Sequence, residues 1–240
     1  MTKKVMRPIA IFDIDGTIFR SSLTIELFRK LVADGVFPAA IISKVRKSEE
    51  KWLNRQGHYD DYVADLVKAY EKSIVGKKRS EVLRACREVI RDHKYRTYRY
   101  TRKLLKTLRG KYFTICISSS PFEVVREYNK FLKFDKIFGW EMGIDERGRY
   151  TGKSLHIPAL YKKELIVRYV RSHSLNFAGS VGVGDTETDI GFLELVSKPI
   201  AFNPNTTLAA EARKRGWKIV LERKDLVVEI DPRKARFLKV

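Results

Sequence analysis

Hydrophobic residues follow two kinds of pattern along this chain of 240 residues. The first kind is a short, continuously apolar run, which is typical of a strand buried on both faces of a parallel sheet. Such runs predict strands at 8–12, 112–117, 180–183, 199–202 and 217–221. Apolar residues at helical spacing predict the helices that separate the later strands, at about 122–132, 162–172 and 207–215.

Helical spacing also dominates residues 22–94, where it recurs four times with no strand-like run between. The first two stretches cover about 23–35 and 38–54. The third ends at Gly76, and Ser80 is a candidate N-cap for the fourth. Four successive helices predict a small helical bundle inserted after the first strand.

The order of these elements predicts an α/β fold. Strands that alternate with helices indicate a parallel sheet covered by helices on both faces, a Rossmann-like core. The segment 137–152 has the pattern of a small hairpin that turns at 145–148. We therefore expect a core of residues 1–20 and 97–240, with residues 21–96 as an inserted helical domain.

The amino-acid composition adds one feature, a large positive net charge. Lys and Arg number 49 against 29 Asp and Glu, which gives a formal net charge of +20. A surface of this kind attracts anions such as nucleic acid, anionic lipid or phosphorylated metabolites. A solvated basic surface without a polyanion partner explains the charge equally well.

Cysteine usage and hydropathy bear on the location of the protein. Cys86 lies on a predicted helix face and Cys116 in a predicted strand, so we expect two buried thiols and no disulfide. No apolar run is long enough to span a membrane. Asp13 interrupts the first apolar run too early for a signal peptide. We expect a cytoplasmic protein without a membrane span, and the sequence predicts no oligomeric state.

The segment 91–111 mixes basic residues with Tyr95, Tyr98 and Tyr100. Aromatic rings among cations can stack on bases and contact phosphates, so this segment is a candidate for nucleic-acid binding. The same residues also fit a helix before the second core strand, with its leucines inward and its lysines outward. We favour the structural interpretation.

Polar clusters mark the ends of three predicted strands. Asp13 and Asp15 follow the first strand, Ser118 the second, and Asp185 and Asp189 the third. The carboxyl ends of parallel strands share one edge of the sheet, where ligands bind in open α/β folds. Grouped carboxylates repel unless a cation lies among them. Because these ligands are all oxygens, the pattern predicts Mg²⁺ as cofactor.

These motifs resemble those of the haloacid dehalogenase superfamily. The matching parts are DIDGT at 13–17, the serine after the second strand, a downstream lysine, and GDTETD at 184–189. The helical insertion is similar to the C1 cap of subfamily IB, the phosphoserine-phosphatase-like branch, and segment 200–220 also resembles that branch. The resemblance implies the haloacid dehalogenase fold. It also implies a phosphatase that uses Mg²⁺ to hydrolyse a phosphate monoester through an aspartyl-phosphate intermediate.

The resemblance assigns roles to the four aspartates. Asp13 would be the nucleophile that attacks phosphorus. Asp15 would protonate the leaving oxygen and then activate the hydrolytic water. Asp13, the backbone carbonyl of Asp15, and Asp185 would hold the metal, with Asp189 stabilising its surroundings.

The resemblance also places residues around the phosphate. Gly16 would allow close approach of the backbone, and Thr17 would brace the loop. Ser118 would donate to a phosphoryl oxygen, and Ser119 beside it would also bind substrate. Ser120 is expected to cap the helix that follows.

A lysine would neutralise charge on the phosphoryl group in its transition state. Lys162 lies at the spacing this branch usually shows, and we rank it ahead of the adjacent Lys163. Lys153, further upstream, is a third candidate.

One departure from phosphoserine phosphatase affects the substrate. That enzyme's glutamate for the substrate ammonium is matched here by Ser22, and Glu26 follows one helical turn later. Arg20 and Ser22 are expected to meet the group attached to the phosphate. The expected partner is a small phosphorylated substrate. Alternatives are a nucleotide, sugar phosphate or phospholipid headgroup, or a non-catalytic nucleic-acid-binding protein on this scaffold.

Overall fold

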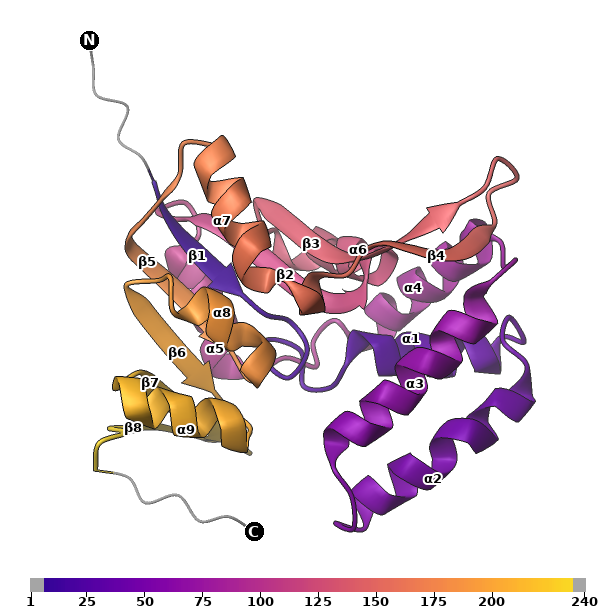
Figure 1. The fold of residues 1–240 in the computed structure, drawn as a ribbon, viewed down its shortest axis with the longest axis horizontal. Coiled ribbons are helices and arrows are strands. Elements are labelled where there is room, and N and C mark those ends of the chain that lie inside the picture. Colours follow the sequence, from indigo (N-terminus) through magenta and orange to yellow (C-terminus); the bar gives the residue numbers. More distant parts are fainter. Residues whose placement is uncertain (1–6, 235–240) are drawn as a thin grey trace.

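The computed structural model describes residues 7–234, and an eight-stranded sheet lies at its centre (Figure 1). The strand order is β4-β3-β2-β1-β5-β6-β7-β8. The strands from β3 to β7 in this order are parallel, and β4 and β8 pair antiparallel at the two edges. Their bounds are β1 Pro8–Phe12, β2 Phe113–Pro121, β3 Lys136–Ile144, β4 Tyr150–His156, β5 Asn176–Gly184, β6 Lys198–Phe202, β7 Lys218–Arg223 and β8 Leu226–Ile230.

Helices cover both faces of the sheet. Residues that alternate along β1 face opposite layers: Ala10 and Phe12 join one hydrophobic cluster, Ile9 and Ile11 the other. The helices of the two layers are α5 Arg99–Leu108 and α6 Phe122–Leu132 on the first face, and α7 Lys162–Ser172, α8 Ile190–Leu193 and α9 Thr206–Arg215 on the second. Burial on both faces explains the continuously apolar runs, and the predicted α/β fold is confirmed.

Four α-helices lie between β1 and α5, on the right of Figure 1. They are α1 Leu23–Ala33, α2 Ile42–Leu53, α3 Tyr59–Ile74 and α4 Arg79–His93, with a 3₁₀ turn, Ala39–Ile41, before α2. The four predicted helices are therefore confirmed. Ser80 is not an N-cap, because α4 already begins at Arg79. The Glu81 carboxylate accepts from the Lys78 backbone N–H at 3.3 Å instead.

The two ends of this helical insertion are hydrogen-bonded to each other. The Arg20 N–H donates to the Arg96 carbonyl at 2.9 Å, and Phe19 forms an isolated bridge with Thr97. The Tyr98 N–H donates to the Ile18 carbonyl at 2.9 Å. The chain therefore leaves the core after β1 and returns to it, just before α5, beside the point where it left.

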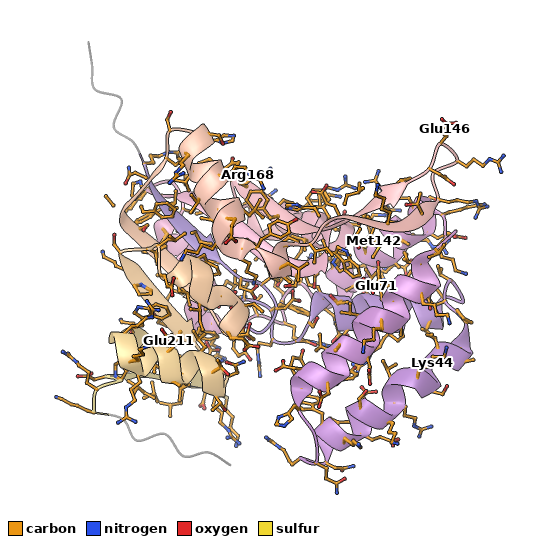
Figure 2. All side chains as sticks on the ribbon, in the orientation of Figure 1. Lys44, Glu71, Met142, Glu146, Arg168 and Glu211 are labelled. Carbon is orange, nitrogen blue, oxygen red and sulfur yellow. The ribbon has the colours of Figure 1, made fainter. Side chains whose placement is uncertain are left out.

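Several elements differ in extent from the expectation. β2 continues through the serines to Pro121, and β5 begins at Asn176, earlier than the apolar run. The strand β8 was not predicted, and it lies at an edge of the sheet, where its apolar residues Leu226, Val227 and Val228 are all exposed. The hairpin of β3 and β4 is confirmed, with Glu146 at its tip (Figure 2).

The structure also confirms the prediction for the thiols. Cys86 and Cys116 are both buried and both free. Burial raises the pKa of each thiol, so both stay protonated at neutral pH. In the described part of the chain, no helix is both long and apolar enough to cross a membrane.

Substitution of Phe19 measures how much the hydrophobic cluster between the insertion and the core contributes to stability. Phe19 is fully buried, and its ring lies edge-on to Tyr128 of α6, with centroids 5.7 Å apart. Phe19→Ala should lower the free energy of unfolding by about 3–5 kcal/mol, because it leaves a cavity in this cluster. Urea unfolding measures the loss. Leu155→Ala, at a residue 61% exposed, is the control, and equal unfolding midpoints for the two variants would contradict the prediction.

Candidate active site

The predicted site residues meet at the carboxyl ends of β1, β2 and β5. The register pairs Phe12 with Cys116 of β2 and with Val183 of β5, so all three strands end at one edge of the sheet. The Asp13 N–H donates to the Val183 carbonyl at 3.0 Å, which extends the pairing by one residue. This hydrogen bond fixes the backbone that carries the Asp13 carboxylate.

Lys162 contacts two of the aspartates from the first turn of α7. Its Nζ lies 2.8 Å from Asp13 Oδ1 and 2.6 Å from Asp189 Oδ1, and all three side chains are almost fully buried. Burial alone lowers the pKa of Lys162, but the two carboxylates more than offset this, so its pKa is raised. Lys162 therefore remains a cation inside the site.

Asp189 uses both carboxylate oxygens within the protein. Oδ1 accepts from Lys162, and Oδ2 accepts from the N–H groups of Asp185 and Thr186 at 2.9 and 3.1 Å. These bonds hold the turn after β5 in place. Asp189 is therefore built to orient Lys162 and Asp185.

Asp185 approaches the loop after β1. Its Oδ1 accepts from the Thr17 hydroxyl at 3.2 Å. Gly16 has a φ of +78°, and a Cβ atom there would lie 2.0 Å from Asp185 Oδ2. Only glycine fits this position, because it combines a left-handed backbone with contact against a carboxylate.

Asp15 points to a different part of the site. Its Oδ2 accepts from the hydroxyls of Ser118 at 2.8 Å and Ser120 at 2.9 Å, and its Oδ1 accepts from the Leu23 N–H at 2.6 Å. Burial raises the pKa of Asp15, although these three hydrogen bonds oppose the effect. A raised pKa suits a group that exchanges protons during turnover.

The acidic residues fit a divalent cation. Asp13, Asp185 and Asp189 each offer an oxygen within 4.8 Å of the others. Burial raises the pKa of Asp13 to about 8, Lys162 opposes this, and Asp189 and Asp15 add to it. Burial also raises the pKa of Asp185. A bound cation would favour the charged forms of both, and an all-oxygen donor set suits Mg²⁺.

In the described residues, the remaining candidates make no hydrogen bond or ion pair with these aspartates. Lys163 is exposed and pairs with Glu194 at 2.9 Å, and Lys153 is exposed on β4. Ser119 is exposed, between two buried serines. Ser22 is buried at the start of α1, and Arg20 is exposed with its guanidinium 5.7 Å from the centre of the Tyr98 ring. Of the three lysines, only Lys162 contacts the aspartates.

Ser120 is a site residue that the sequence analysis assigned wrongly. It does not cap α6, whose N-cap is Pro121, because its side chain is turned inward from β2. Its Oγ bonds to Asp15, lies 2.8 Å from the Thr24 hydroxyl, and accepts from the Thr24 N–H at 3.2 Å. This role was missed because β2 extends to Pro121, beyond the apolar run that predicted the strand.

Tyr59 was not identified from the sequence. It is the first residue of α3, and its ring lies 5.1 Å from Trp52 and 6.3 Å from Tyr62, centroid to centroid. Partial burial raises the pKa of Tyr59, and the negative charges of Asp15 and Asp185 raise it further. Trp52, Tyr59 and Tyr62 form an aromatic cluster of the insertion.

Glu26 is buried beside the site but is already paired. Its carboxylate accepts from Arg96 at 2.7 Å and from Ser21 at 2.9 Å, and His93 lies 3.6 Å away. These partners compensate the charge of Glu26 without a ligand.

Gly16 provides a test of the loop. Gly16→Ala should reduce activity and the apparent affinity for Mg²⁺ together, by at least about tenfold, because the new methyl group must displace the Asp185 carboxylate. Gly76→Ala is the matched control, since φ is +74° there but nothing lies within 4 Å of the added Cβ. Titration of activity against Mg²⁺ measures both variants. Equal losses would show that backbone strain, and not contact with Asp185, explains the effect.

Comparison with known proteins agrees with this geometry. The family model for haloacid dehalogenase-like hydrolases matches residues 10–194. Histidinol-phosphatase of Neisseria meningitidis serogroup C (strain 8013) is 24% identical over 231 residues, 90% of this chain and 99% of that protein. Inhibition of morphological differentiation protein of Streptomyces azureus is 24% identical over 223 residues, 89% of this chain and 78% of that protein.

Solved structures share the fold. A protein of unknown function from Bordetella pertussis Tohama I has a TM-score of 0.71 at 18% identity and covers 90% of this chain and 98% of its own. A phospho-aspartyl intermediate analogue of phosphoserine phosphatase has a TM-score of 0.61 at 19% identity, over 92% and 95%. The family match spans most of the chain and includes both aspartate motifs, and the protein belongs to the haloacid dehalogenase-like hydrolases.

Proposed function

We propose that this protein is a Mg²⁺-dependent phosphatase that hydrolyses a phosphate monoester through an aspartyl-phosphate intermediate. The observation that carries the proposal is the buried contact of Lys162 with Asp13, 2.8 Å from Nζ to Oδ1, beside the carboxylates of Asp185 and Asp189, which follow β5. Family membership and a histidinol-phosphatase relative support a phosphatase.

Asp13 is the proposed nucleophile. One carboxylate oxygen forms a bond to phosphorus while the bond between phosphorus and the ester oxygen breaks. Lys162 orients Asp13 through the hydrogen bond to Oδ1 and supplies positive charge where the phosphoryl group carries negative charge. A metal held by Asp13, Asp185 and the Asp15 carbonyl would supply further positive charge at the phosphate.

Asp15 is the proposed acid and base. It gives a proton to the departing ester oxygen, and it then accepts a proton from the water that attacks phosphorus and releases Asp13. The hydroxyls of Ser118 and Ser120 and the Leu23 N–H hold its carboxylate in place. Because the Leu23 N–H belongs to α1, the insertion helps to position this group.

The helical residues 21–96 are proposed to act as a cap over a core of residues 1–20 and 97–240. Closure of such a cap excludes water and encloses the leaving group. Arg20, Ser22 and Ser119 remain candidates for substrate binding.

The surroundings of Glu26 bear on the substrate. An amino-acid phosphate needs a carboxylate for its ammonium, and the Glu26 carboxylate is already bonded to Arg96 and Ser21. This argues against phosphoserine itself and favours a small phosphorylated substrate recognised in another way. A screen of phosphorylated metabolites with Mg²⁺, histidinol phosphate included, identifies it.

Asp13→Asn tests the proposed function. The amide is a poor nucleophile, so turnover of a chromogenic phosphate monoester should fall by about three orders of magnitude or more. Asp61→Asn makes the same chemical change at an exposed residue of α3 and should retain activity. Near wild-type turnover by Asp13→Asn, with circular dichroism unchanged, would refute the role of Asp13.

Ser120→Ala tests Asp15 through the pH profile. Loss of the hydroxyl removes a hydrogen bond that favours the charged carboxylate, so the pKa of Asp15 should rise further. If protonated Asp15 serves the leaving oxygen, the alkaline limb of the kcat profile moves to higher pH. Ser43→Ala, on the surface of α2, is the control. An alkaline limb that stays in place or moves to lower pH would contradict the assignment.

A further inference from the structure

A basic surface on one side of the molecule is not used by the proposed reaction. It is formed by the C-terminal half of α4, by α5 and by the C-terminal end of α6, and it contains two adjacent hollows. The larger, about 590 Å³, is lined by Arg99, Arg102, Lys103, Lys106 and Arg109, with no carboxylate among its lining residues. No aspartate of the active site lines either hollow.

The second hollow, about 330 Å³, continues this charge. Four cations and one carboxylate line it: Arg87, Arg91, Lys94 and Lys130, with Glu127. Arg91 pairs with Asp92 at 2.7 Å, and Lys130 pairs with Glu127 at 2.6 Å. In residues 7–234, the charged groups of the other seven cations have no carboxylate oxygen within 4.0 Å. The Arg109 guanidinium donates to the Leu132 carbonyl, and the Glu222 carboxylate accepts from the backbone N–H of Arg99 at 2.9 Å.

The arrangement of α5 makes this face unusual. Arg99 and Lys103, and likewise Arg102 and Lys106, lie four residues apart, so each pair places two like charges side by side on the helix. Leu105 and Leu108 of α5 are buried, as expected from the sequence, and Leu105 forms part of the wall of the larger hollow. The helix therefore buries its leucines and exposes cations whose charged groups have no carboxylate partner.

Aromatic rings lie between the cations. Phe131 lines both hollows and thereby joins them. The Tyr95 ring, 68% exposed, meets Phe131 edge-on with centroids 5.3 Å apart, and Lys94 Nζ lies 5.2 Å from the Tyr95 centroid. Exposed rings beside cations are the features that hold bases and phosphates of an unpaired strand.

We propose that this surface binds single-stranded nucleic acid, with phosphates in the two hollows and a base stacked on Tyr95. Cations that have no carboxylate partner are free to replace the counterions of a phosphodiester chain. Hollowed surfaces suit a flexible strand better than a bilayer, which is flat and cannot enter them. The bound strand contacts α4, α5 and α6 and leaves the aspartate edge of the sheet free.

Charge reversal at two positions tests the proposal. Fluorescence anisotropy of a labelled 15-nucleotide RNA and of the matching DNA measures binding over a range of salt concentrations. Arg102→Glu with Lys106→Glu should weaken binding about tenfold or more and lower the magnitude of the salt slope by at least about 1.4, at about 0.7 per phosphate contact on a single strand. Tyr95→Ala should weaken binding about fivefold or more through lost stacking.

The matched control carries the same change of charge on the opposite face of the sheet. Arg168→Glu with Arg171→Glu alters two exposed residues of α7, of which Figure 2 labels Arg168, and should retain binding. All variants should keep wild-type turnover of a small chromogenic ester, or, if none has activity, wild-type circular dichroism. Equal loss in both double variants would overturn the proposal in favour of attraction by overall charge. Binding to anionic phosphatidylserine vesicles without binding to either oligonucleotide would also overturn it.

Discussion

The rest of the site depends on one buried cation, the Lys162 ammonium. Three carboxylates at the edge of a sheet repel one another, and burial makes their charged forms costly. Lys162 Nζ lies within 2.8 Å of Asp13 and 2.6 Å of Asp189 and offsets part of that repulsion. The first turn of α7 carries this lysine, and Tyr169 of α7 packs against Phe113 of β2 and Phe138 of β3, so the packing of α7 on the sheet sets where the ammonium lies.

The Asp15 carboxylate is held by hydrogen bonds from both the sheet and the helical insertion. Two of its hydrogen bonds come from β2 through Ser118 and Ser120, and the third comes from the backbone of Leu23 at the start of α1. Thr24 of α1 adds contacts to Ser120. A shift of α1 relative to β2 therefore changes the environment of the group proposed to transfer protons.

Most of the fold was predictable because burial on both faces leaves a clear signal. Pro8–Phe12 is both the apolar run in the sequence and the strand β1. The aspartates follow strands directly, so topology alone placed them at one edge. The strand β8 was missed although Leu226–Ile230 is mostly apolar in sequence, and it lies at an edge of the sheet with most of its residues exposed.

The finer features of the site depend on contacts between distant segments. Ser120 has the sequence of a helix cap, and only its contact with Thr24, 96 positions away, shows where its hydroxyl points. Tyr59 follows no motif, since its place depends on how α3 packs in the insertion. The choice between Lys162 and Lys163 rested on spacing, which does not distinguish neighbours, whereas burial separates them.

The pairing of Arg20 with Arg96 and of Phe19 with Thr97 has a consequence for the architecture. Because these two chain segments are hydrogen-bonded to each other, they close the insertion at its base. The helical residues between them can therefore differ in length without altering the register of the strands in the sheet. A different bundle would have to preserve two features. One is the Leu23 N–H that donates to Asp15, and the other is the set of apolar residues buried against α6. The sheet can thus stay unchanged while the helical bundle, which is joined to it by two paired segments, is replaced.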